Sequence, residues 1–164
     1  LYSSAASDVY KRQGRVVVKG RDERKRQIVQ QCGLEYAANF RAGEGFDCVI
    51  EAVGSARALE ESLLLTAPGG RFVLMGNPDG PRTLSQDLYW RILRKQLTLT
   101  GTWNSSYGGA DSDWIEAVHA MESGKLQTAG VVTHALKKTE LEKGLAIMRD
   151  GMNTYCKIML QLDK

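Results

Sequence analysis

The fold is decided by two neighbouring stretches, FDCVIEAVGSA (46–56) and APGGRFVLMGNP (67–78). Each contains a nearly continuous apolar run that ends at a glycine, Gly54 in the first and Gly76 in the second. Such runs are typical of strands that are buried on both faces in a parallel sheet. Between them, Ser55 can cap a helix. The apolar face of that predicted helix contains Leu59, Leu63 and Ala67. The two stretches therefore predict a β-α-β unit of an α/β fold.

The rest of the chain continues this alternation on both sides. Strands are predicted at 15–19, 36–40, 46–53, 71–75, 97–100, 131–136 and 156–162. Helices are predicted at 22–32, from 55 to the break at Pro68-Gly69-Gly70, at 83–95, at 111–122 and from 139 onward. Gly33 suits the residue after a helix end, and capping boxes are predicted at 83–86 and 139–142. The pattern predicts a doubly wound parallel sheet, with the last portion in a different layer.

Composition excludes several classes of protein. The 164 residues (18.1 kDa) are 43% hydrophobic and 25% charged, as in a globular domain with its own core. A net charge of +3 is too small to indicate nucleic-acid binding, and no apolar run approaches the roughly 20 residues of a membrane span. The cysteines, Cys32, Cys48 and Cys156, are odd in number and lack C-x-x-C spacing. They indicate a reducing, cytoplasmic compartment. His119 and His134 lack metal-site spacing.

The first thirteen residues, LYSSAASDVYKRQ (1–13), have no clean helical or strand period and no starting Met. They resemble a translated sequencing-adapter artefact, and we expect them to be non-native. The alternative is a disordered native terminus. If the segment is an artefact, the native chain is truncated at this end.

Three predicted strands end at a glycine: Gly54, Gly76 and Gly101. Ligands of open α/β sheets bind beyond the carboxyl ends of the strands, where glycine allows close approach to the backbone. Ordinary tight turns are the alternative interpretation. The helix predicted after the first strand begins among basic residues, which favours either a bound anion or a solvated basic face. These residues are Lys19, Arg21, Arg24, Lys25 and Arg26.

From Gly14 onward the chain resembles the C-terminal part of the zinc-dependent medium-chain dehydrogenases. Within that family it is most similar to polyol dehydrogenases of the galactitol-1-phosphate 5-dehydrogenase type. Four blocks carry the resemblance: the two quoted above, RILRKQLTLTGTWNSS (91–106) and VVTHALKKTELEKGLAIMRDG (131–151). The third block, with Trp103 and Asn104, is the most specific to the polyol-phosphate branch.

The resemblance implies a partial Rossmann domain over 14–128 and a return into a GroES-like catalytic domain over 129–164. In the strand order 3-2-1-4-5-6 the first strand and its G-x-G-x-x-G turn would be absent, which separates the second strand from the fourth. Catalytic residues and zinc ligands would lie in the missing N-terminal portion, so none is assigned to this chain. We expect the fragment alone to be poorly folded, inactive and without detectable dinucleotide binding.

The resemblance also implies half of a cofactor site. Val53, Gly54 and Ser55 would border the adenosine, and the Met75, Thr102 and Asn104 backbones would hold the nicotinamide carboxamide. Lys157 would reach the pyrophosphate, or else is a solvated edge-strand lysine. The assigned cofactor residues are Gly20, Arg21, Val53, Gly54, Ser55, Met75, Gly76, Thr102, Asn104 and Lys157.

One position departs from the usual NAD pattern. The acid that binds the ribose 2′-OH in NAD enzymes is replaced by Gly20, followed by Arg21. A small residue with an arginine favours a 2′-phosphate, so we expect NAD or NADP with a preference for NADP. Asp22 could restore the acid if the alignment slips.

The implied reaction is reversible hydride transfer between the secondary alcohol of a polyol or polyol phosphate and the nicotinamide, with zinc assistance. The full-length protein would be a dimer or tetramer, with 97–100 as the edge where two sheets pair. Alternatives are a non-catalytic dinucleotide-binding module, a methyltransferase-like Rossmann domain and a zinc-free quinone-reductase relative.

Overall fold

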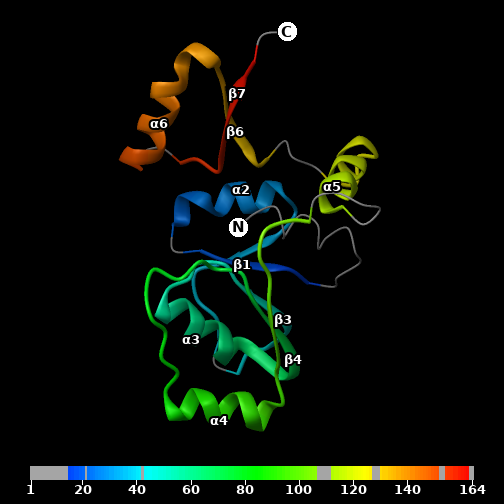
Figure 1. The fold of residues 1–164 in the computed structure, drawn as a ribbon, viewed down its shortest axis with the longest axis vertical. Coiled ribbons are helices and arrows are strands. Elements are labelled where there is room, and N and C mark those ends of the chain that lie inside the picture. Colours follow the sequence, from blue (N-terminus) through cyan, green and yellow to red (C-terminus); the bar gives the residue numbers. More distant parts are fainter. Residues whose placement is uncertain are drawn as a thin grey trace. The chain divides into compact units, whose positions relative to one another are not determined.

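A computed structural model describes residues 15–20, 22–41, 43–106, 112–126, 130–151 and 154–162 (Figure 1). The predicted non-native segment 1–13 lies outside the described residues. The chain divides into two compact units. One unit is Phe40–Ser105, and the described residues of the other lie within Tyr2–Asn39 and Ser106–Lys164. The predicted domain boundary at 128/129 also falls on residues that are not described, and it stays a prediction.

The unit Phe40–Ser105 is a three-stranded parallel sheet with two helices (Figure 1). Its strands are β3 (Phe46–Glu51), β4 (Thr66–Leu74) and β5 (Thr98–Gly101), in that order. Its helices are α3 (Ala56–Leu65) and α4 (Gln86–Lys95). Leu63 of α3, Phe72 of β4 and Leu88 of α4 form one buried cluster, so both helices cover the same face of the sheet. Within this unit Ile50, on the opposite face of β3, stays 37% exposed.

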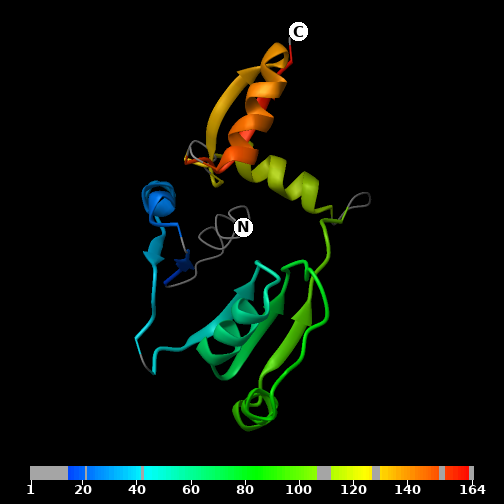
Figure 2. The ribbon, with the colours of Figure 1, turned by 90° about the vertical axis from the view of Figure 1, so that its left-hand side faces the viewer.

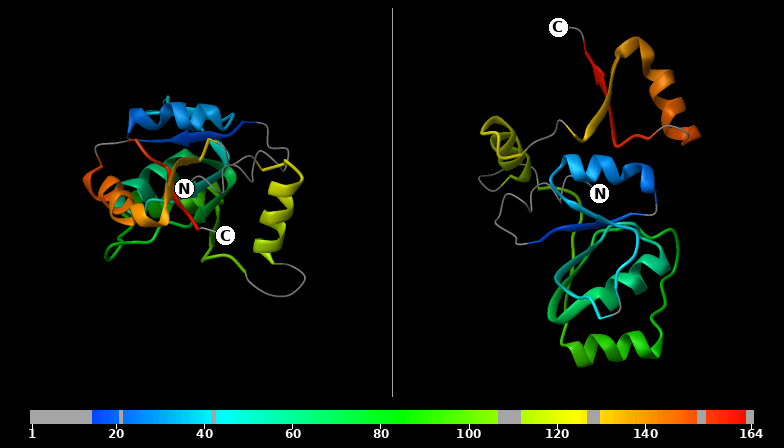
Figure 3. Two further views of the ribbon diagram at one scale, coloured as in Figure 1. Left: turned by 90° about the horizontal axis from the view of Figure 1, so that it is seen from above. Right: turned by 180° about the vertical axis from the view of Figure 1, so that it is seen from behind.

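The other unit contains two smaller parallel pairs, each with a helix. The first pair is β1 (Val17–Lys19) with β2 (Glu35–Ala37), and a 3₁₀ turn η1 (Glu23–Lys25) leads into α2 (Arg26–Gln31), which lies alongside (Figure 3). The second pair is β6 (Val132–Lys137) with β7 (Lys157–Gln161). The 3₁₀ turn η2 (Lys138–Glu140) and α6 (Leu141–Asp150) connect them, and α6 packs on the pair (Figure 2). The remaining helix is α5 (Asp113–Glu122).

The sheet pairing confirms the predicted α/β fold with parallel strands. In the described part of the chain, β1–β2 and β3–β4–β5 are separate ladders. The predicted strand order 3-2-1-4-5-6, without its first strand, stays a prediction. Among the described residues, no helix is both long and apolar enough to cross a membrane.

The predicted boundaries were wrong around Pro68-Gly69-Gly70. These residues lie within β4 and do not end the helix, which stops at Leu65. The strand absorbs them through an irregularity, since Phe46 pairs with Thr66 whereas Cys48 pairs with Arg71. The extra residues of β4 that have no partner on β3 form a bulge, and Gly69 adopts the positive φ of 73° within it.

Both predicted capping boxes were misplaced. Helix α4 begins after Ser85, whose Oγ accepts a hydrogen bond from the Leu88 amide at 3.2 Å. The second box belongs to Lys137 and Glu140, where the Glu140 carboxylate accepts from the Lys137 amide at 3.0 Å. In each case the shift is two residues, because a neighbouring polar side chain satisfies the first free amides of the helix.

Candidate functional site

Three turns meet at the carboxyl edge of the β3–β4–β5 sheet. The parallel register pairs Glu51 with Leu74 and Leu74 with Gly101, so the strands end level with one another. The turns that follow them, at 52–55, 75–82 and 102–105, therefore lie side by side within one unit. This edge is where open α/β sheets bind their ligands.

Glu51 organises the first turn. The residue is buried, with only 4% of its surface exposed. Its side-chain Oε1 accepts hydrogen bonds from the amides of Val53 at 2.7 Å and Gly54 at 2.8 Å. Its carbonyl oxygen accepts from the amides of Met75 at 2.9 Å and Gly76 at 2.8 Å. A buried carboxylate requires such partners, and bonds to a charged acceptor are among the stronger ones in proteins. One residue thus fixes the turns after both β3 and β4.

Gly54 and Gly76 are glycines because these two turns are in contact. Gly54 has φ of +83°, and a Cβ there would lie 2.1 Å from the Asn77 carbonyl oxygen. A Cβ on Gly76 would lie 2.2 Å from the Gly54 amide nitrogen. No side chain fits at either distance, so Gly54 and Gly76 allow backbone to pack on backbone. A Cβ on Gly101, the third strand-end glycine, would meet nothing within 4 Å.

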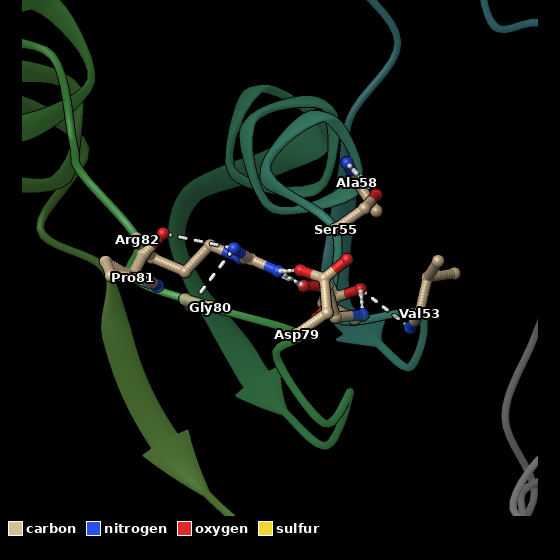
Figure 4. A network of polar contacts seen from close by, with 9 residues as sticks. Val53, Ser55, Ala58, Asp79, Gly80, Pro81 and Arg82 are labelled. Atoms are coloured by element: carbon tan, nitrogen blue, oxygen red, sulfur yellow. Dashed lines mark hydrogen bonds and ion pairs between the residues drawn. The ribbon is translucent and has the colours of Figure 1, made fainter.

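Arg82 joins the end of the second turn to the first (Figure 4). Its Nε donates to the Gly54 carbonyl oxygen at 2.9 Å, and its Nη2 also donates to that oxygen. Nη2 forms an ion pair with Asp79, and Nη1 donates to the carbonyl oxygens of Gly80 and Pro81, each at 3.1 Å. The guanidinium holds the pKa of the Asp79 carboxyl below its ordinary value, through their hydrogen bond first and charge attraction second.

The outer rim of the site is formed by Val53 and Ser55. The Val53 residue is 51% exposed and offers an apolar surface directly after the strand. The Ser55 Oγ accepts a hydrogen bond from the Ala58 amide at 3.2 Å (Figure 4). Ser55 thereby caps the N-terminus of α3 at this edge. An exposed apolar side chain beside the start of a helix can pack on the face of a purine, with the helix start near a phosphate.

The third turn contributes Thr102 and Asn104. The Thr102 amide donates to the Leu74 carbonyl oxygen at 3.0 Å, just as the Met75 amide donates to Glu51. The amides of Met75 and Thr102 thus have acceptors within the protein, and the role of these two backbones toward a carboxamide stays a prediction. Asn104 has φ of +52°, the left-handed conformation that non-glycine residues adopt at modest cost and often at functional sites.

The structure thus brings most of the predicted cofactor residues to one edge. Those together in the Phe40–Ser105 unit are Val53, Gly54, Ser55, Met75, Gly76, Thr102 and Asn104. Gly20, at the end of β1, and Lys157, on β7, belong to the other unit, and Arg21 lies outside the described residues.

The basic segment before α2 is partly neutralised by its own carboxylates. Arg24 donates from Nε to Asp22 at 2.8 Å, and the Arg24 amide donates to the same carboxylate at 3.1 Å. These bonds lower the pKa of Asp22. The Arg26 Nε pairs with Glu23. Asp22 is therefore engaged with Arg24, which weakens its case as a ribose-binding acid.

Sequence reasoning missed Glu51, Arg82 and Tyr36, which contacts Gly20. Glu51 had a usable signal, because it is a lone acid inside an apolar strand and such a residue needs partners. Arg82 and Tyr36 had none, because their contacts depend on how separate turns approach one another.

Residues 9–123 match the family model described as zinc-binding dehydrogenase. The chain belongs to this family. The L-threonine 3-dehydrogenase of Bacillus velezensis is 34% identical over 118 residues, which cover 72% of this chain and 33% of the relative. The chain thus spans about a third of the length of this curated relative.

Solved structures of dehydrogenases show the same fold at low sequence identity. Galactitol-1-phosphate dehydrogenase from Escherichia coli superposes with a TM-score of 0.75 at 18% identity, covering 94% of this chain and 49% of that one. An alcohol dehydrogenase from E. coli CFT073 in complex with NADH has a TM-score of 0.73 at 19% identity, with coverages of 90% and 44%. A zinc-binding dehydrogenase from Sinorhizobium meliloti 1021 bound to NADP has a TM-score of 0.72 at 16% identity, covering 96% of this chain and 46% of that one.

The residues of the β3–β4–β5 edge fit half of a dinucleotide site. Two packed glycine turns, a capped helix start and carbonyl oxygens at a sheet edge suit an adenosine and a carboxamide. For zinc, the described residues contain no group of three or more His, Cys, Asp or Glu side chains placed to hold an ion. No step of the chemistry is therefore assigned to a metal-binding residue of this chain.

Proposed function

We propose that this chain is the cofactor-binding and C-terminal portion of a dehydrogenase that transfers hydride between a secondary alcohol and a nicotinamide dinucleotide. The observation that carries the proposal is the edge formed by the turns after β3, β4 and β5, joined by Glu51 and Arg82. Membership in the zinc-binding dehydrogenases supports it. Residues 129–164 would return into a GroES-like catalytic domain, and the zinc ligands and catalytic residues would come from chain outside this sequence.

Each residue of the edge has a role in positioning the cofactor. Val53 packs on the adenine, and Gly54 and Ser55 border the adenosine where α3 begins. The carbonyl oxygens of Met75 and Thr102 accept from the carboxamide, which fixes which face of the ring meets the alcohol. Two residues outside this edge keep the roles that the family resemblance implies, as predictions: Lys157 toward the pyrophosphate and Arg21 toward a 2′-phosphate. The nicotinamide, when bound, accepts or returns the hydride.

The proposed cofactor is NADP ahead of NAD. Gly20 provides no carboxylate at the end of β1, and Asp22 is engaged by Arg24. Gly20 thus presents no carboxylate to a 2′-phosphate, and the nearby carboxylates of Asp22 and Glu23 are paired with Arg24 and Arg26.

The proposed substrate is a polyol or polyol phosphate, and the polar run after β5 (Asn104 to Ser106) supports a hydroxylated compound. L-threonine is the second candidate, favoured by the 34% identity to an L-threonine 3-dehydrogenase. Both carry a secondary alcohol next to polar groups, so the reaction class is the same. A cytoplasmic homo-oligomer, dimer or tetramer, completes the proposal.

Titration of the complete protein with NADPH and NADH, followed by quenching of tryptophan fluorescence, tests cofactor binding. Saturable binding with NADPH the tighter ligand supports the proposal, and tighter NADH binding contradicts the preference. Absence of saturable binding to either would contradict the cofactor site. Sequencing the source DNA upstream of the codon for residue 14 tests whether the zinc ligands and catalytic residues are encoded there. A G-x-G-x-x-G turn preceded by Cys, His and Glu zinc ligands is expected, whereas a start codon leading directly into residue 1 would favour a non-catalytic binding module.

A further inference from the structure

The aromatic ring of Tyr36 lies where a side chain at position 20 would project. Val18 and Gly20 face the same side of β1, and Tyr36 pairs with Val18 in the parallel register. A Cβ built on Gly20 would lie 2.7 Å from Cε2 of that ring and 3.1 Å from its hydroxyl oxygen. A side chain at position 20 therefore requires the ring to move.

Two contacts hold the ring in that place. The Tyr36 hydroxyl donates to the Gly20 carbonyl oxygen at 2.9 Å. The body of the residue packs against the cluster of Val29 and Leu34 beneath α2. Moving the ring would break the hydrogen bond and expose apolar surface, so the structure itself disfavours an acid at the end of β1.

The same ring supports a cation. The Arg26 guanidinium carbon lies 5.0 Å from the ring centroid, within the range of a cation–π contact. Glu23 engages Nε of Arg26. The guanidinium carries further N–H donors on its two terminal nitrogens, the geometry that binds phosphate through paired hydrogen bonds.

We propose that Tyr36 is a specificity-determining residue, which excludes an acid at position 20 and presents Arg26 to the 2′-phosphate of an adenosine cofactor. The inference rests on the proposed dinucleotide function and assigns its 2′-phosphate preference to one ring. A carboxylate at position 20 would accept from a 2′-hydroxyl and repel a 2′-phosphate. With the Tyr36 ring in that place, no carboxylate binds a 2′-hydroxyl or repels a 2′-phosphate, and Arg26 on the ring can bind the phosphate.

The test compares two probes that differ only in the 2′-phosphate, adenosine 5′-monophosphate and adenosine 2′,5′-bisphosphate, by calorimetric titration of the complete protein. The chain is expected to bind the bisphosphate about tenfold more tightly or better, the effect of charge-assisted bonds. Tyr36→Ala is expected to bring the two affinities within about threefold, and adding Gly20→Asp to that variant is expected to reverse the preference. Tyr36→Phe keeps the ring and is expected to keep the preference.

Tyr155→Ala is the matched control, because Tyr155 is a half-buried tyrosine whose ring also carries a cation, Lys25 at 5.3 Å. It is expected to leave the preference unchanged. Circular dichroism checks that each variant folds; if Tyr36→Ala does not, Arg26→Gln removes the guanidinium and is expected to abolish the preference. A preference that survives Tyr36→Ala or Arg26→Gln overturns the inference, as does equal binding of both probes by the unmodified chain. If neither probe binds the unmodified chain, the proposed function is overturned together with the inference.

Discussion

The Nε atom of Arg82 donates a hydrogen bond to the carbonyl oxygen of Gly54 over 2.9 Å, across 28 positions of sequence. The acceptor belongs to the turn whose amides bond to Glu51, so the turn is fixed on both its N–H and its C=O groups. A loop held in this way presents its outer rim to a ligand with little loss of conformational freedom on binding.

Arg82→Ala is expected to destabilise the chain by about 1–3 kcal/mol, because a partly buried carbonyl loses a charged donor. Arg82→Lys is expected to give a smaller loss, since an ammonium keeps the charge without the planar fork. Urea unfolding followed by circular dichroism measures both. Arg57→Gln removes an 83% exposed side chain paired with Glu61 and is expected to change stability by less than about 0.5 kcal/mol. An equal loss in Arg57→Gln and Arg82→Ala would contradict the role of the Gly54 contact.

Glu51→Ala is expected to cost about 2–4 kcal/mol, since the amides of Val53 and Gly54 lose a charged acceptor in a buried place. Glu51→Gln retains an acceptor oxygen and is expected to cost less. The free energy of unfolding and amide hydrogen exchange at Gly54 measure the effect. Glu60→Gln, an exposed glutamate on α3, serves as the control. Unchanged exchange at Gly54 in Glu51→Ala would show that the carboxylate does not hold this turn.

Gly54→Ala is expected to destabilise the chain by more than about 2 kcal/mol, because the backbone conformation disfavours a Cβ and Asn77 leaves no room for one. Gly80→Ala is the control, since a Cβ at Gly80 meets nothing within 4 Å and the residue has no positive φ. It is expected to stay within about 0.5 kcal/mol of the parent. The midpoints of thermal unfolding of the two variants, measured side by side, compare their stabilities. Similar midpoints would mean that the two turns can separate without cost.

Cys48 is expected to react with iodoacetamide several times faster than Cys32 and Cys156. Cys48 is exposed on β3, whereas the other two are partly buried. Burial raises the pKa of Cys32 and of Cys156, so at pH 8 each carries less of the reactive thiolate. Mass spectrometry of timed alkylation at pH 8, with labelling in urea as the reference, measures the three rates. Fastest labelling at Cys156 would contradict the described burial.

Much of the fold could be predicted from local sequence. The apolar runs at 46–51 and 71–74 specify strands, and Gly54 and Gly76 lie in the turns that follow them. Helix boundaries were less predictable, because Ser85 competes with Thr83 for the same capping role and only the packing of Leu88 chooses between them. The bulge at Pro68-Gly69-Gly70 could not be foreseen either, since a helix break and a strand bulge use the same residues.

The sequence by itself determined the alternation of strands and helices, the parallel pairing and the family, because these follow from short apolar periods and from blocks of residues in a fixed order. Tertiary structure decided which residue types particular positions in those blocks can hold. Gly54 is a glycine because Asn77 packs on it, and outside these blocks the Tyr36 ring fills the space that a side chain at position 20 would need. Contacts of this kind join residues from separate turns. They depend on how the turns approach one another in space, a distance that no local periodicity records.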